Sequence, residues 1–310
     1  MSQTPGQELM SNGAQLPALR FNYTKTLHKD TYDYISPTRA NLANKAVFVT
    51  GASKGIGRAT ALSYARAGAS HIALGARSSL SSLAAEMLSA AKEAGRPAPE
   101  ILTLELDVTS RSSVDGAAEA VKAQFGRLDI LVNNAGYLET FVAIADSDPD
   151  EWWRAHETNV RGAYLCTRAL LPLLLGTAAG LATILFLSSV GAHATRVGAS
   201  GYQTTKLALL RFAEFVGAEY GAQGLLAFSV HPGGVPSEMG LRMPKDLHWV
   251  LTDTPEVAAD TIVFLTRERR EWLAGRYVSC TWDMEEFLAK RAEIEKGDLL
   301  KVRMAVSMGE

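Results

Sequence analysis

The sequence predicts an α/β protein with a doubly wound sheet of about seven parallel strands and helices on both faces. Short, continuously apolar runs recur along the chain, as strands buried on both faces require. Amphipathic runs with helical periodicity separate most of them, which is typical of crossover helices. The strand-like runs are 45–50, 71–76, 101–107, 129–134, 182–189, 225–230 and 275–280. The helical runs include 57–68, 80–95, 112–126, 257–268 and the segment that begins at Tyr202. In such a sheet, ligands are expected beyond the carboxyl ends of the strands.

The regular alternation divides the chain into three predicted parts. Residues 1–43 are polar and lack periodicity, and we expect them to be an N-terminal extension. Residues 44–283 show no linker and are predicted to form one domain. Residues 284–310 are predicted to be a charged C-terminal tail. The side chains expected to pin part of the extension are Tyr23, Tyr32, Tyr34 and Ile35.

Composition argues against several classes of partner. The 310 residues are 47% hydrophobic, enough for a sizeable core, and the net charge is −2, which offers no attraction for nucleic acid or an anionic membrane. Cys166 and Cys280 do not form a disulfide framework, and their spacing fits no metal site. No apolar run of about 18 residues and no signal peptide is present. We therefore expect a cytoplasmic protein without a metal, nucleic-acid or membrane partner.

A glycine-rich turn follows the first predicted strand directly. It reads TGASKGIGRAT and contains Gly51, Gly55 and Gly57. Glycines let the chain turn tightly and approach a pyrophosphate, and the following helix N-terminus offers N–H groups to that anion. Such a turn alone is a weak signal. Between the first strand and the first helix of this alternation, it predicts a dinucleotide site.

The end of the second predicted strand favours NADP(H) over NAD(H). An acidic residue there would bind the ribose 2′-hydroxyl of NAD, whereas a basic residue would accept the 2′-phosphate of NADP. The sequence LGARSS has Arg77 and no acid, and Lys54 in the glycine-rich turn is a second cation. The alternative is that both are solvated surface charges.

A tyrosine and a lysine on one helix face are the candidate proton-transfer groups. Tyr202 and Lys206 are four residues apart, so their side chains are neighbours on a helix. The positive charge favours the phenolate, and we expect it to lower the pKa of Tyr202 from about 10. Such a phenol can exchange a proton with an alcohol or ketone. Ser189, at the end of an apolar strand, is placed to hold the same oxygen. On its own, the spacing also fits a solvated surface pair.

Taken together, these motifs resemble the short-chain dehydrogenase/reductase family, in its compact single-domain branch with a Rossmann-type sheet. The resemblance covers about residues 44–280. The matching motifs, in the family's order, are TGASKGIG, LDVT with Asp107, NNAG at 133–136, Asn159, Ser189, the Tyr202/Lys206 pair and HPGGVPS at 231–237.

The resemblance implies a role for each matched residue. Tyr202 would be the general acid/base, with Lys206 lowering its pKa and binding the nicotinamide ribose. Ser189 would orient the substrate oxygen, and Asn159 would hold a water that links Lys206 to solvent. The residues assigned to the cofactor are Gly51, Ser53, Lys54, Gly55, Ile56, Gly57, Arg77, Asp107, Val108, Asn133, Ala135, Gly136, Tyr202, Lys206, Pro232, Gly233, Val235 and Ser237.

Some residues near these motifs also fit purely structural roles. Asn133 and Asn134 could chiefly tie strands together. Ser188 is expected to pack or to bond a helix, and His231 is expected to be structural. His193 fits either a substrate contact or, in preference, a solvated loop position.

We therefore predict an NADP(H)-dependent oxidoreductase that interconverts a ketone or aldehyde and an alcohol on a largely apolar small molecule. Arg196 and Arg242 are the candidates for contact with a substrate anion. The sequence looks like fungal family members, many of which serve secondary metabolism, and the family implies a homodimer or homotetramer. The apolar lining expected for the substrate is Tyr137, Leu138, Phe141, Met239, Leu241, Met243 and Trp249.

Two alternative functions and one question about the chain end remain open. The same groups could serve dehydration, isomerisation or ring formation, and a redox-inactive NADP(H)-binding sensor or scaffold would need only the cofactor site. At the chain end, CTWDMEEF replaces the family's common Asp-Gly-Gly-type ending. Trp282 and the tail are expected either to close the pocket or to reach a neighbouring subunit.

Overall fold

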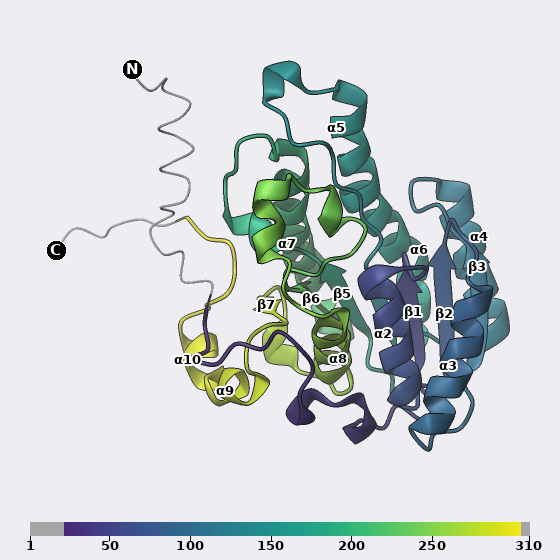
Figure 1. The fold of residues 1–310 in the computed structure, drawn as a ribbon. Coiled ribbons are helices and arrows are strands. Elements are labelled where there is room, and N and C mark those ends of the chain that lie inside the picture. Colours follow the sequence, from purple (N-terminus) through teal and green to yellow (C-terminus); the bar gives the residue numbers. More distant parts are fainter. Residues whose placement is uncertain (1–21, 305–310) are drawn as a thin grey trace, which may run out of the picture.

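The predicted strands form one seven-stranded sheet in which all neighbours are parallel (Figure 1). The computed structural model describes residues 22–304. The order is β3-β2-β1-β4-β5-β6-β7, so the winding direction reverses between β1 and β4. That reversal opens a crevice at the carboxyl ends of the strands. The strands are β1 (Ala46–Thr50), β2 (His71–Ala76), β3 (Glu100–Glu105), β4 (Ile130–Asn133), β5 (Thr183–Leu187), β6 (Leu226–His231) and β7 (Tyr277–Ser279).

Helices cover both faces of the sheet because successive strand residues point to opposite sides. In β1, Val47 and Val49 join the core beneath α2, α3 and α8, whereas Phe48 joins the core beneath α4, α6 and α7. Burying each such side chain contributes about 1.5–3 kcal/mol. The helices are α2 (Gly55–Arg66), α3 (Ser81–Glu93), α4 (Arg111–Phe125), α5 (Pro149–His156), α6 (Gly162–Gly176), α7 (Ser200–Tyr220), α8 (Pro255–Thr266), α9 (Met284–Ala289) and α10 (Arg291–Lys296).

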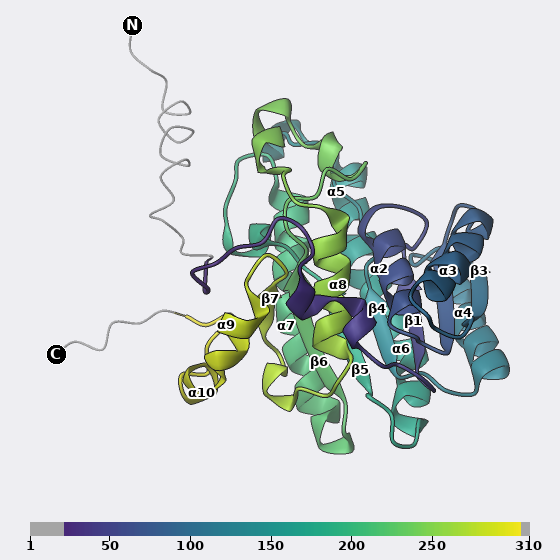
Figure 2. The same ribbon diagram turned by 60° about the horizontal axis from the view of Figure 1, so that its bottom comes forward.

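The segment before β1 runs beside the C-terminal helices, although it lies far from them in sequence (Figure 2). The Glu286 carboxylate accepts hydrogen bonds from the backbone N–H groups of Lys25 and Thr26. His28 pairs with Asp283 at 2.9 Å. Ile35 is fully buried in the core that α8 shares. These contacts attach the described part of the N-terminal segment to both α8 and α9.

Trp282 is the centre of this junction. It is 2% exposed, and its ring packs against Tyr23, Tyr277 and Phe287. The expectation that Trp282 closes the pocket or reaches another subunit is therefore wrong, because the side chain is buried inside its own chain. Beyond it, the tail continues along β7, where the Tyr277 N–H donates to the Leu300 carbonyl at 2.8 Å.

Candidate functional site

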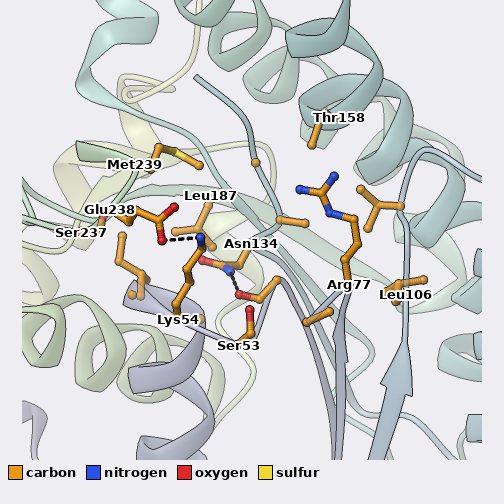
Figure 3. A pocket seen from close by; sticks show the side chains of 18 of the residues that line it. Ser53, Lys54, Arg77, Leu106, Asn134, Thr158, Leu187, Ser237, Glu238 and Met239 are labelled. Atoms are coloured by element: carbon orange, nitrogen blue, oxygen red, sulfur yellow. Dashed lines mark hydrogen bonds and ion pairs between the residues drawn. The ribbon is translucent and has the colours of Figure 1, made fainter. Parts of the chain in front are cut away.

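A pocket of about 430 Å³ lies at the carboxyl ends of the strands, over the point where the winding reverses (Figure 3). The glycine-rich turn after β1 forms one wall, and α7 contributes another. Fifteen of the predicted site residues line it: Gly51, Ser53, Lys54, Gly55, Ile56, Gly57, Arg77, Asp107, Val108, Ala135, Gly136, Tyr202, Lys206, Pro232 and Ser237. Within residues 22–304, no cluster of His, Cys, Asp or Glu could hold a metal, and no helix is long and apolar enough to cross a membrane.

The glycine-rich turn is shaped for a phosphate group. Gly51 has φ +67°, which side chains rarely adopt, and a Cβ on Gly57 would lie 2.4 Å from the Gly51 oxygen. The turn leads directly into α2, where no side chain of the described residues caps the first N–H groups. Uncapped N–H groups beside an open pocket suit a pyrophosphate. The residues present therefore fit a dinucleotide.

The turn is supported by Asn134, a residue to which we assigned no cofactor contact. Its amide Nδ2 donates to the carbonyls of Thr50 and Gly51 at 2.8 and 3.1 Å, and it lines the pocket. Asn133, which was assigned to the cofactor, does not line the pocket. Its Nδ2 instead donates to Thr167 of α6 at 3.3 Å. Neighbouring residues at a strand end point to opposite sides, so Asn134 lines the pocket and Asn133 points toward α6, and the cofactor contact expected of Asn133 stays a prediction.

The two predicted cations lie on different sides of the pocket. Figure 3 shows Arg77 on one side and Lys54 turned toward Glu238 on the other. Lys54 Nζ lies 2.5 Å from the Glu238 carboxylate, so its charge is paired there instead of adding to that of Arg77. Burial tends to raise the pKa of Asp107, but hydrogen bonds from Thr109 and the charge of Arg77 outweigh it and lower that pKa. Arg77 is therefore the cation near Asp107, one of the residues assigned to the cofactor.

Ser189, Tyr202 and Lys206 come together as the resemblance implied. Ser189 ends the loop after β5, and its hydroxyl forms a hydrogen bond with the Tyr202 phenol. Tyr202 lies in the first turn of α7, and Lys206 Nζ lies 5.3 Å from the centre of its ring. Lys206 is 4% exposed and donates to the Leu187 carbonyl at 2.7 Å. A hydroxyl, a phenol and an ammonium thus converge beside the pocket.

The pKa of the phenol differs from the expectation. Burial raises the pKa of Tyr202 to about 12, which outweighs the lowering by the Ser189 hydrogen bond, and the charge of Glu139 raises it further. Burial lowers the pKa of Lys206 to about 8. The prediction that Lys206 holds the pKa of Tyr202 below 10 is therefore wrong. Helical spacing revealed the neighbour but not the low-dielectric surroundings that both groups share.

Asn159 is positioned by a widened helical turn. Residues Glu157–Arg161 form a π-helical turn between α5 and α6, an irregularity that is frequent at functional sites. The buried amide accepts from the Tyr137 N–H at 2.7 Å and donates to the Tyr137 carbonyl and the Thr205 hydroxyl, each at 2.9 Å. Asn159 thus joins the segment after β4 to α7. Its role in a water relay stays a prediction.

Several other predicted residues lie behind the pocket wall. Gly233 packs against Asp253, whose carboxylate accepts from the Gly234 N–H at 2.6 Å, and Val235 is 5% exposed. Neither Gly233 nor Val235 lines the pocket, so they support the turn from behind. The helix contact expected of Ser188 is confirmed, because its hydroxyl donates to the Lys206 carbonyl at 2.8 Å.

Neither His193 nor His231 lines the pocket. His193 packs edge-on against the Tyr277 ring, with the ring centres 4.7 Å apart, so it is neither a pocket residue nor a freely solvated one. His231 ends β6, and burial lowers its pKa to about 4. Both observations fit structural roles.

The arginines considered for a substrate anion are paired with acids. Arg242 lies 3.5 Å from the Glu151 carboxylate and over the Tyr137 ring, and Arg196 lies 3.1 Å from Asp246. They do not form an arginine cluster. Of the expected apolar lining, Met239 borders the pocket and Leu138 is buried, whereas Trp249 is 75% exposed.

Comparison with known proteins agrees with this geometry. The family model described as short chain dehydrogenase matches residues 45–247. The chain belongs to the short-chain dehydrogenase/reductase family of oxidoreductases. A short chain dehydrogenase from Monascus purpureus is 52% identical over 290 residues, which cover 94% of this chain and 99% of the relative. Another from Monascus ruber is 49% identical over 288 residues, which cover 91% and 94%.

Solved structures share the fold. A short-chain type dehydrogenase/reductase from Mycobacterium marinum aligns with a TM-score of 0.68 and 27% identity over 77% of this chain and 94% of its own. A 3-ketoacyl-(acyl-carrier-protein) reductase from Brucella melitensis, complexed with NADH, aligns with a TM-score of 0.65 and 25% identity, over 76% and 96%. A Shigella flexneri short chain dehydrogenase complexed with NADP aligns with a TM-score of 0.66 and 28% identity. The alignment covers 76% of this chain and 96% of that structure. The family therefore uses NAD(P)(H), and these neighbours include both forms.

Proposed function

We propose that the protein is an NADP(H)-dependent oxidoreductase that interconverts a ketone or aldehyde and an alcohol. The observation that carries the proposal is the hydrogen bond between Ser189 and Tyr202 beside Lys206, at one wall of a pocket whose other wall is the glycine-rich turn. A bound nicotinamide would supply or accept the hydride. Ser189 and Tyr202 are placed to donate hydrogen bonds to the substrate oxygen, and Tyr202 to deliver a proton to it.

The side chains beyond β2 support the choice of NADP(H). Residues 76–78 carry Arg77 and no carboxylate, and Arg77 lines the pocket. A 2′-phosphate needs such a cation, whereas a 2′-hydroxyl is normally bound by an acid at this position.

The surroundings of the pocket support an apolar small-molecule substrate. Met239 lines the pocket, and Leu241 and Trp249 are exposed on the segment that follows it in the sequence. Because the relatives are fungal and similar over nearly the whole chain, we place the reaction in fungal secondary metabolism.

We further propose that two copies of the chain associate through α6 and α7. These helices expose Tyr164, Leu207 and Phe215, at 47%, 39% and 56%, although large apolar side chains are usually buried. A second copy would cover them.

We place the protein in the cytoplasm, since Cys166 and Cys280 are buried free thiols. We expect no nucleic-acid or membrane partner, because the net charge is −2.

Cofactor absorbance tests the main proposal. We expect NADPH consumption with at least some members of a panel of apolar ketones and aldehydes, and formation of NADPH from NADP⁺ with the corresponding alcohols. Conversion of a substrate without change in the cofactor would favour dehydration, isomerisation or cyclisation instead. NADPH binding with no conversion of any compound would favour a sensor.

A further inference from the structure

Glu139 places a buried carboxylate at the start of the helix that carries Tyr202. The residue lies between β4 and α5 and is 5% exposed. Its Oε1 accepts a hydrogen bond from the backbone N–H of Tyr202 at 2.8 Å. Tyr202 is the third residue of α7, so this N–H has no partner within the helix. The carboxylate therefore holds the first turn of α7 at the residue that bears the phenol.

The second carboxylate oxygen shows that capping alone does not account for Glu139. Oε2 is buried and has no hydrogen-bond partner among the described residues, which is costly for a charged group. A cavity of about 10 Å³ beside it, also lined by Asp148 and Glu151, has room for at most one water. A neutral side chain would cap the helix without this cost. The charge itself thus requires a reason.

Gly201 leaves room for the carboxylate against the start of α7. A Cβ added to Gly201 would lie 3.0 Å from both Cδ and Oε1 of Glu139, and 3.1 Å from Trp152 Cδ1. The Trp152 indole N–H donates to the Ser200 hydroxyl at 3.1 Å. Gly201 is therefore the space into which the carboxylate fits, and the helix start, the indole and the carboxylate form one packed unit.

We propose that Glu139 is a positioning residue for Tyr202, whose negative charge opposes that of Lys206 and keeps the phenol protonated until it donates to the carbonyl oxygen. The proposal rests on the proposed function. Three side chains from different elements act on the phenol: Glu139 from the segment after β4, Lys206 from α7 and the neutral Ser189 from the end of β5. The partial positive charge of the helix N-terminus acts in the same direction as Lys206. Glu139 is the group in this set that favours the protonated phenol.

The test measures the pKa of Tyr202 directly, without turnover. NMR of protein with isotope-labelled tyrosine ring carbons follows the signal that Tyr202→Phe removes, as the pH is raised. Glu139→Gln keeps an oxygen acceptor for the helix N–H but removes the charge, so the pKa should fall by about one unit. Glu139→Ser, which removes the charge with a side chain too short to reach the helix N–H, should shift it in the same direction if the glutamine variant does not fold. Glu151 lines the same small cavity but accepts a hydrogen bond from the Tyr137 hydroxyl. The control variant Glu151→Gln should therefore shift the pKa of Tyr202 far less.

Kinetics provide the second readout. With a ketone that the enzyme reduces, the pH at which activity is lost on the alkaline side should fall by the same amount in Glu139→Gln. The rate on the pH plateau should stay within about threefold of the wild-type rate. Glu139→Leu, which also removes the acceptor, should lower kcat about tenfold or more. An unchanged pKa of Tyr202 in folded Glu139→Gln and Glu139→Ser overturns the proposal. If the wild type reduces no carbonyl compound, the proposed function fails, but the NMR titration still decides whether Glu139 controls the phenol.

Discussion

Lys206 donates a hydrogen bond to the backbone carbonyl of Leu187 at 2.7 Å, while its own carbonyl accepts from Ser188 at 2.8 Å. These bonds tie the middle of the first half of α7 to the end of β5. Ser189 directly follows Ser188 in the chain, so these two hydrogen bonds set the position of its hydroxyl relative to the Tyr202 phenol. The end of β5 therefore helps to align the groups proposed to transfer the proton.

Replacement of Tyr202 by phenylalanine should abolish turnover and leave NADPH binding nearly intact. The change removes one hydroxyl, and loss of a general acid costs about a hundredfold to ten-thousandfold in rate. Turnover and fluorescence titration of NADPH measure the two effects. Tyr220→Phe, at the far end of α7, is the matched control and should keep the wild-type rate. Equal turnover by Tyr202→Phe and wild type would refute the mechanism.

Arg77→Ala should raise the KM for NADPH far more than the KM for NADH. The guanidinium that lines the pocket would bind the 2′-phosphate, which NADH lacks. Loss of a charged hydrogen bond of about 1.5–3 kcal/mol corresponds to a factor of about ten to a hundred. Arg291→Ala on α10 removes the same charge outside the pocket and should change neither constant. Similar changes for both cofactors would exclude a 2′-phosphate contact.

Glu238→Gln should strengthen NADPH binding modestly. Lys54 and Glu238 form an ion pair on one side of the pocket, and removing the acid would free Lys54 for the cofactor phosphates. Because both side chains are exposed, the pair is weak, so the Kd should fall by at most about fivefold. The effect should shrink at high salt. Glu219→Gln, at the end of α7, is the charge-matched control, and weaker binding by Glu238→Gln would contradict the prediction.

His231 should make the protein lose stability in acid. Its pKa is lowered from 6.5 to about 4 in the folded state, because burial disfavours the imidazolium. Between these pH values the unfolded chain binds more protons, so the free energy of unfolding falls as the pH falls through that window. The contribution is on the order of 2–3 kcal/mol. Urea unfolding of wild type and His231→Gln should show a shallower pH dependence in the variant, and equal slopes would disprove this.

Much of the fold could be predicted because it depends on patterns that are local in sequence. The seven apolar runs all became strands, and the predicted helices began or ended within two residues of those observed. Parallel pairing follows from the crossover connections that the helical runs provide. By contrast, the attachment of the N-terminal segment to α9 through Glu286 joins residues more than 250 positions apart, which no local pattern reveals.

The candidate site divides in the same way. The glycine spacing lies within one turn, and the Tyr202/Lys206 interval lies within one helix. Because both patterns are local in sequence, they identified the pocket and the groups proposed for proton transfer. How distant segments pack determines the contact of Asn133 with α6, the pairing of Lys54 with Glu238 and the approach of Glu139 to α7.

Local sequence patterns were enough to identify the family, the glycine-rich turn and the residues Ser189, Tyr202 and Lys206. The electrostatics of those residues depend instead on tertiary packing. A pKa depends on burial and on every charge within a few ångströms, and Glu139 reaches the start of α7 from 63 positions earlier in the chain. Residue identity therefore determines which proton can move, whereas the packing around it sets how readily that proton leaves.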